Sequence, residues 1–131
     1  AMRFWAFACL LTLSLSLPAG AQTSEEDGLT PFELTCVFAT ECVDEDCAGT
    51  DFEITVTGRL GGDGPPPFGE MEIASIAETV QGSGEYDGEL LTMLGRTAGA
   101  IHLLTSLPEG ARYSVHQVGI PLAITYLGHC Q

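Results

Sequence analysis

Residues 51–60 read DFEITVTGRL, and this stretch decides the fold class. The apolar side chains of Phe52, Ile54 and Val56 alternate with polar ones along it. A period of two puts successive side chains on opposite faces of an extended chain. The stretch therefore predicts a half-buried β-strand, with one face toward a core and the other toward solvent.

The segment before it predicts a partner strand. Residues 33–43 are rich in Val, Phe and Thr, and a strand there places Cys36, Phe38 and Cys42 on one face. An acidic turn between Cys42 and Cys47 joins the two strands. We therefore expect a hairpin that a Cys42–Cys47 disulfide staples near its tip.

The segments after residue 60 are harder to assign. Residues 61–69 are rich in Gly and Pro and predict a loop. Residues 70–81 fit two structures. Apolar residues at helical spacing, with Gly82 as a C-cap, favour a helix, whereas the β-branched content favours a strand. We expect the strand. Residues 82–88 are expected to form a turn-rich link.

The C-terminal part predicts more short strands. Residues 90–94 and 100–106 are expected to form a hairpin, because two glycines inside one helix would cost roughly 2 kcal/mol relative to alanine. A turn at 107–110 then precedes a strand over 111–117, with Tyr113 and Val115 inward and Arg112, Ser114 and His116 outward. After a turn at 118–121, a strand over 122–130 places one set of residues on one face, namely Leu122, Ile124, Tyr126 and Cys130.

These segments together predict an all-β fold. About seven short strands at this spacing are typical of a small antiparallel barrel or sandwich, stapled here by disulfides. We expect residues 33–131 to form this single β domain.

The N-terminal residues predict export. Residues 1–21 combine Arg3, an apolar run and the small residues Ala19 and Ala21, which is the pattern of a cleaved signal peptide. The alternative is an uncleaved membrane anchor. Residues 22–32 are expected to form a flexible acidic leader, and no second apolar run of membrane length follows. The expected location is the periplasm or the extracellular space.

Four cysteines remain after this cleavage. An even number of cysteines in an exported chain indicates two disulfides, and we favour Cys36–Cys130 with Cys42–Cys47 among the three possible pairings. The first would join the first strand to the last. A four-cysteine metal site is the alternative, but such a site needs two close pairs and Cys130 stands alone.

The charge balance limits the partners. The chain has 18 Asp and Glu against 4 Lys and Arg, for a formal net charge of −14. Nucleic acid is therefore excluded as a partner, because phosphate binding needs clustered Lys and Arg. The negative potential favours a basic protein partner, or serves only solubility.

Few residues point to chemistry. His102, His116 and His129 lie in the last three expected strands and are a speculative zinc or copper site; the alternative is scattered surface histidines. The acids at Asp44, Glu45 and Asp46 lack the order of a calcium-binding EF-hand loop and indicate a solvated turn. Hydrolase, dithiol-redox, phosphate-loop and dinucleotide motifs are missing from the sequence. We expect a non-catalytic binding or structural module without a cofactor.

The C-terminal stretch carries a resemblance. Residues 110–116 and the closing Tyr126-Leu127-Gly128-His129-Cys130 are similar to uncharacterised exported proteins of marine alphaproteobacteria. Those proteins share a cysteine-bounded start and an acidic Cys-to-Cys turn. That resemblance implies no activity.

A weaker similarity is to periplasmic inhibitors of C-type lysozyme, which use a Ser-Gly-x-x-Tyr loop. Here Gly110, Arg112 and Tyr113 match that loop, and Glu109 stands in place of the serine. The downstream Thr-Lys-Gly element of that family is missing. The resemblance implies a small antiparallel β-barrel, with a partner-binding site at these four residues.

Overall fold

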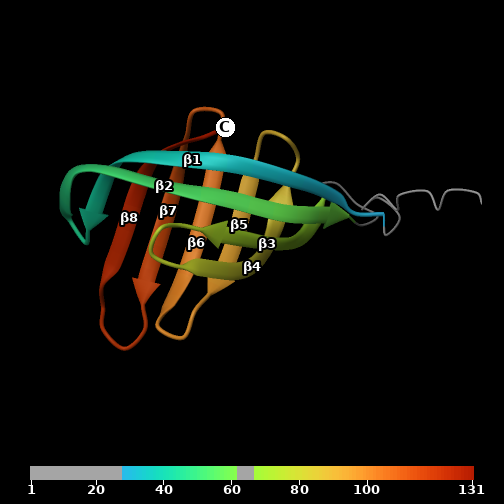
Figure 1. Ribbon diagram of the computed structural model, residues 1–131. Coiled ribbons are helices and arrows are strands. Elements are labelled where there is room, and N and C mark those ends of the chain that lie inside the picture. The colour runs from blue at the N-terminus through green and yellow to red at the C-terminus, as the bar shows by residue number, and fades with distance from the viewer. Residues whose placement is uncertain (1–27, 62–66) are drawn as a thin grey trace, which may run out of the picture.

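The computed structural model describes residues 28–61 and 67–131. The expected signal peptide at 1–21 and residues 22–27 of the expected leader lie outside these ranges. Within these two ranges, all the regular structure is β-strand (Figure 1). The eight strands are β1 (Thr30–Val43), β2 (Asp46–Gly61), β3 (Phe68–Ala74), β4 (Thr79–Tyr86), β5 (Leu91–Arg96), β6 (Ala100–Leu107), β7 (Gly110–Gln117) and β8 (Ala123–Cys130).

The strands form a closed antiparallel barrel. Each strand pairs with the next in the chain, and β8 pairs back with β1. Figure 1 shows β1–β4 in front, running across β5–β8 behind. The expectation of an all-β, disulfide-stapled barrel is therefore confirmed. Within the described residues, no helix is long and apolar enough to cross a membrane.

The alternation in residues 51–60 has the predicted outcome. Ile54 and Val56 are buried, and they lie opposite Cys36 and Leu34 of β1. Cys36 and Phe38 belong to the core, whereas Cys42 lies beyond a register shift between Phe38 and Thr40 and is outside the core cluster. A β-bulge at that point changes the direction of the long hairpin.

The structure has eight strands where about seven were expected, because residues 70–81, expected as one strand, belong to both β3 and β4. Residues 82–86 belong to β4 rather than to a turn-rich link. Gly82 and Gly84 do not make turns here: a Cβ at either position would collide with a backbone carbonyl of β5, that of Leu94 or Thr92. Glycine thus marks a close approach of two strands rather than a loop.

Two other boundaries differ from the expectation. Residues 70–81 are extended as expected, but a turn at Ser75–Glu78 divides them between β3 and β4; the Ser75 hydroxyl accepts hydrogen bonds from the backbone N–H groups of Ala77 and Glu78. β1 begins at Thr30, so residues 30–32 of the expected flexible leader are strand.

Side chains fill the interior. Phe38, Met71, Met93 and Leu104 are all at most 2% exposed and form one cluster with the inward residues of the other strands. An eight-stranded barrel has an interior just wide enough for such filling. Tyr113 and Val115 point into it and Arg112 and His116 point out, as the alternation predicted.

Both favoured disulfides are present. Cys36–Cys130 joins β1 to β8 at directly opposed positions, and Cys42–Cys47 closes the β1–β2 hairpin. Their sequence separations are 94 and 5 residues. In the chain-entropy model, stabilisation grows with the length of the closed loop.

We predict unequal losses when each disulfide is removed. The Cys36→Ala/Cys130→Ala variant should lose about 4 to 5 kcal/mol of unfolding free energy, and Cys42→Ala/Cys47→Ala about 2 kcal/mol. Urea denaturation of both variants and the wild type measures the two losses. Equal losses would contradict a stabilisation that depends on loop length.

Candidate functional site

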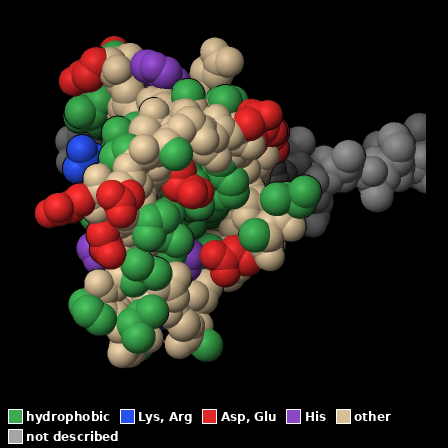
Figure 2. Space-filling view, turned by 90° about the vertical axis from the view of Figure 1, so that its left-hand side faces the viewer, with side chains coloured by type: hydrophobic (Ala, Val, Ile, Leu, Met, Phe, Trp, Pro, Cys, Tyr) green, Lys and Arg blue, Asp and Glu red, His purple; other side chains and the backbone are tan. Residues whose placement is uncertain are grey.

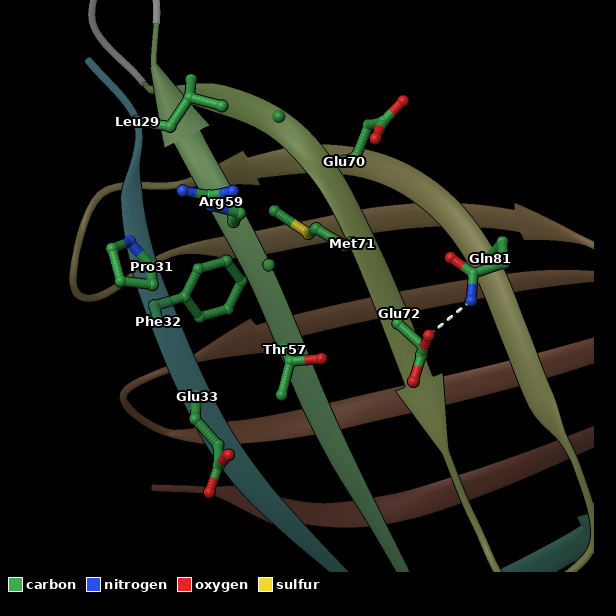
Figure 3. A pocket seen from close by; sticks show the side chains of 12 residues that line it. Leu29, Pro31, Phe32, Glu33, Thr57, Arg59, Glu70, Met71, Glu72 and Gln81 are labelled. Carbon is green, nitrogen blue, oxygen red and sulfur yellow. Dashed lines mark hydrogen bonds between the residues drawn. The ribbon is translucent and has the colours of Figure 1, made fainter. Parts of the chain in front are cut away.

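The structure offers an open groove on the outer side of β1–β4. Its volume is about 900 Å³, and it runs over β1, β2 and β3 to Gln81 of β4. Figure 3 shows the carboxylates of Glu33, Glu70 and Glu72 standing around the ring of Phe32 and the side chain of Met71. Met71 is buried beneath the groove, so the apolar contact area beside the acidic rim comes from the exposed Pro31 and the half-buried Phe32.

Strand register explains why these acids meet. Glu33 of β1 lies opposite Thr57 of β2, and Thr57 lies opposite Glu72 of β3. Outward positions of neighbouring strands form rows across the sheet, so residues far apart in sequence come together. Gln81 continues the row on β4, and its side-chain amide donates a hydrogen bond to Glu72.

One cation lies in the same groove. Arg59 of β2 is opposite Glu70 of β3 and contributes to the lining. Three carboxylates against one guanidinium leave the groove with a net negative charge. A second basic side chain would still find carboxylates there, and its aliphatic stem would contact Pro31 and Phe32.

The residues that the lysozyme-inhibitor resemblance points to are divided between the two sides of β7. Glu109, Gly110 and Arg112 line a second open groove on the outside of β1, β6, β7 and β8. Tyr113 points into the barrel and is only 3% exposed. The tyrosine contact that the resemblance implies is therefore not presented at this surface.

Tyr113 instead belongs to a buried polar pair. Its hydroxyl and Nδ1 of His102, which is 0% exposed, share a hydrogen bond of 2.6 Å. Nε2 of His102 lies 3.3 Å from the Thr97 hydroxyl and 3.9 Å from a carboxylate oxygen of Glu78. A neutral ring with its proton on Nε2 fits this arrangement, since Nδ1 then accepts from the tyrosine hydroxyl.

Burial governs the titration of this pair. Burial lowers the pKa of His102, and the charge of Glu78 opposes the shift in part. Burial also raises the pKa of Tyr113 above its ordinary value. Both groups are thus held neutral, which suits a structural pair inside a core better than proton transfer at a surface.

Aromatic rings continue from this pair toward the β1–β2 hairpin. Tyr113, Phe38, Phe52 and Tyr126 stack in one cluster, with the Phe52 and Tyr126 centroids 4.4 Å apart. Burial and, after it, a hydrogen bond with Glu41 raise the pKa of Tyr126 to about 12.

The structure does not bring the three histidines together. His102 is inside the barrel, whereas His116 and His129 are exposed on its outside. The expectation of scattered surface histidines was also wrong for His102, because its position faces the core. Among residues 28–61 and 67–131, no group of three or more His, Cys, Asp or Glu is placed to hold a metal ion.

The acidic turn has a local structural role. Asp44 adopts a φ of 53°, and its carboxylate accepts a hydrogen bond from the Ala123 N–H of β8. The cysteines of the described chain are joined in the two disulfides, so none of these four offers a thiolate. Sequence reasoning missed the groove on β1–β4; its only signal was the outward placement of Glu33, Glu70 and Glu72 in alternating strands.

Comparison with family models, curated proteins and solved structures finds no significant match to this chain.

We predict that His102 makes stability depend on pH. Its folded pKa lies below the ordinary 6.5, so the unfolded chain binds more protons as the pH falls below 6.5. The stability advantage of the wild type over His102→Gln should be full above that pH and shrink toward pH 5. Urea midpoints at several pH values measure it, with the exposed His116→Gln as a control for removing an imidazole. An advantage that does not change with pH would contradict the prediction.

Proposed function

We propose that this protein is an exported, non-catalytic binding module of the cell envelope, and that it binds a basic protein partner. The acid-rimmed groove on β1–β4 supports the proposal most directly. Its carboxylates can receive a Lys or Arg side chain whose aliphatic part lies against Pro31 and the half-buried Phe32. The net charge of −14 would speed the encounter with such a partner.

The two disulfides support the location. They suggest an oxidising, exported compartment, in which such bonds form and persist. Figure 2 views the barrel from the β1–β2 hairpin side and shows many carboxylates beside few arginines. A partner approaching this side meets a predominantly negative surface.

Inhibition of C-type lysozyme is a second candidate. It is favoured by the placement of Glu109, Gly110 and Arg112 side by side in the second groove. The buried Tyr113 counts against the loop contact of that family. Lysozyme is itself basic, so it serves as a probe for both candidates.

We predict that lysozyme binds through the groove on β1–β4. The Glu70→Gln/Glu72→Gln variant should bind it about tenfold more weakly, or roughly 1.4 kcal/mol, because two attracting charges are removed. The control Glu89→Gln/Glu109→Gln removes the same charge away from the groove and should bind nearly as the wild type does. Isothermal titration calorimetry measures both.

Three outcomes separate the candidates. Binding that is lost in the groove variant alone supports the proposal. Binding that is lost only in the Glu109 variant, together with slowed lysis of bacterial walls, favours the inhibitor instead. If lysozyme does not bind at micromolar concentration, the result contradicts both candidate functions.

A further inference from the structure

The acidic residues are distributed unevenly along the chain and therefore around the barrel. Of the 18 Asp and Glu, only Glu109 follows residue 90. Strands β5–β8 contain no Asp or Glu, although they contain Arg96 and Arg112. Since β5–β8 form one side of the barrel, that side differs in character from β1–β4 (Figure 1).

The outer face of β5–β8 has an ordered pattern. Leu94 and Leu103 are opposite one another at its centre, and they are 55% and 40% exposed. The row on one side contains Arg96 and His116. The row on the other side contains Arg112 beside Leu127. Exposed leucines thus lie between two rows that each carry an arginine.

Further apolar side chains extend the face at both ends. Leu107 and Val37 are 45% and 44% exposed and line the second groove with Arg112 and His129. At the other end, Val118 and Ile120 in the β7–β8 turn are each 58% exposed. The Val118 N–H donates a hydrogen bond to the Gly99 carbonyl. This bond holds the β7–β8 turn against the β5–β6 turn.

The two arginines of this face are not neutralised locally. Within the part of the chain that the structure describes, neither Arg96 nor Arg112 has a carboxylate at ion-pair distance, although Glu109 lines the same groove as Arg112. Both side chains are exposed. In a chain with 18 acids, this placement leaves two guanidinium groups available to an external anion.

We propose that the outer face of β5–β8 binds peripherally to an anionic lipid bilayer. A bilayer offers phosphates for the arginines and, just beneath them, apolar acyl chains for the leucines. An acidic protein surface offers the charges without an apolar layer of the same extent. Pairing two copies through this face would bring four arginines together without a carboxylate from these strands.

The acidic side of the barrel does not prevent such binding. Facing sheets are about 10 Å apart, and their outward side chains add to that distance. The Debye length at physiological ionic strength is about 8 Å. Carboxylates on the outer side of β1–β4 are therefore largely screened from a membrane that touches β5–β8. The groove on that side stays accessible to a protein partner.

Vesicle sedimentation tests the proposal. The exported, disulfide-bonded protein is mixed at 0.15 M salt with vesicles of phosphatidylcholine alone, or with phosphatidylglycerol added to one third. We expect binding to the anionic vesicles and at least a fivefold smaller bound fraction on the neutral ones. The wild type and all variants share one N-terminus, so differences between them report the barrel.

Three variants locate the contact. Arg96→Gln/Arg112→Gln and Leu94→Ser/Leu103→Ser should each reduce the bound fraction at least fivefold; these side chains are exposed, and circular dichroism confirms folding. Arg59→Gln removes one positive charge from the opposite side, as Arg96→Gln alone does from this face, and it should bind as the wild type does.

Four results would overturn the proposal: no binding to anionic vesicles, equal binding to both vesicle types, equal loss in Arg59→Gln, or self-association through the leucines without vesicle binding. The groove variant Glu70→Gln/Glu72→Gln should keep its vesicle binding. Failure of the lysozyme experiment and failure of this one are therefore distinguishable.

Discussion

Closure of the sheet between β1 and β8 is the constraint on which the rest of the structure depends. Cys36 and Cys130 are opposite residues of that pairing, and their disulfide joins strands at the two ends of the domain. An open sheet would leave two strands with unpaired N–H and C=O groups, which invite association with other chains. Closure removes both edges and encloses the core.

The closed interior of the barrel is filled by side chains. Large inward side chains such as Phe38, Met93 and Leu104 occupy the space that a wider barrel would offer to a ligand. The buried His102–Tyr113 pair satisfies its own polar atoms there. The binding that we propose is therefore assigned to the outward positions of the strands, where side chains are not constrained by core packing. This is why the candidate surfaces consist of outward residues that lie side by side on paired strands, rather than of loop residues.

Much of the fold follows from patterns that are local in sequence. Alternation in residues 51–60 and 111–117 predicted the strands and their buried faces correctly. Only one of the two faces of such a strand is apolar, so only that face can be turned toward the core. The cysteine pairing was predictable from the even count and the spacing. β4 was not predictable in the same way, because Gly82 and Gly84 resemble turn residues until the carbonyls of β5 are known to lie against them. His102 likewise appears to be an ordinary strand histidine until the register places it opposite Val115, facing inward.

The groove on β1–β4 depends on register between strands, which no single segment specifies. The register at the hairpin tip, Cys42 opposite Cys47, would pair Glu33 with Val56, but the shift between Phe38 and Thr40 pairs it with Thr57. Glu72 lies on a further strand, so the shared row appears only in the folded barrel. The inner placement of Tyr113 follows from alternation alone. The loop resemblance, however, implies that Tyr113 is exposed to a partner. These two expectations exclude one another.

The division of charge has a simpler origin, in the topology. In a barrel whose strands are ordered around the axis as they are along the chain, the first half of the sequence forms one side and the second half the other. A composition change near residue 90 therefore becomes a difference between two opposite faces. A Greek-key or swapped order would have mixed the strands and cancelled this difference. Because the strands follow one another around the barrel, the uneven distribution of Asp and Glu along the chain becomes a difference between two sides of the molecule. One side is rich in carboxylates and the other carries leucines and arginines, so the two sides can contact different partners at once.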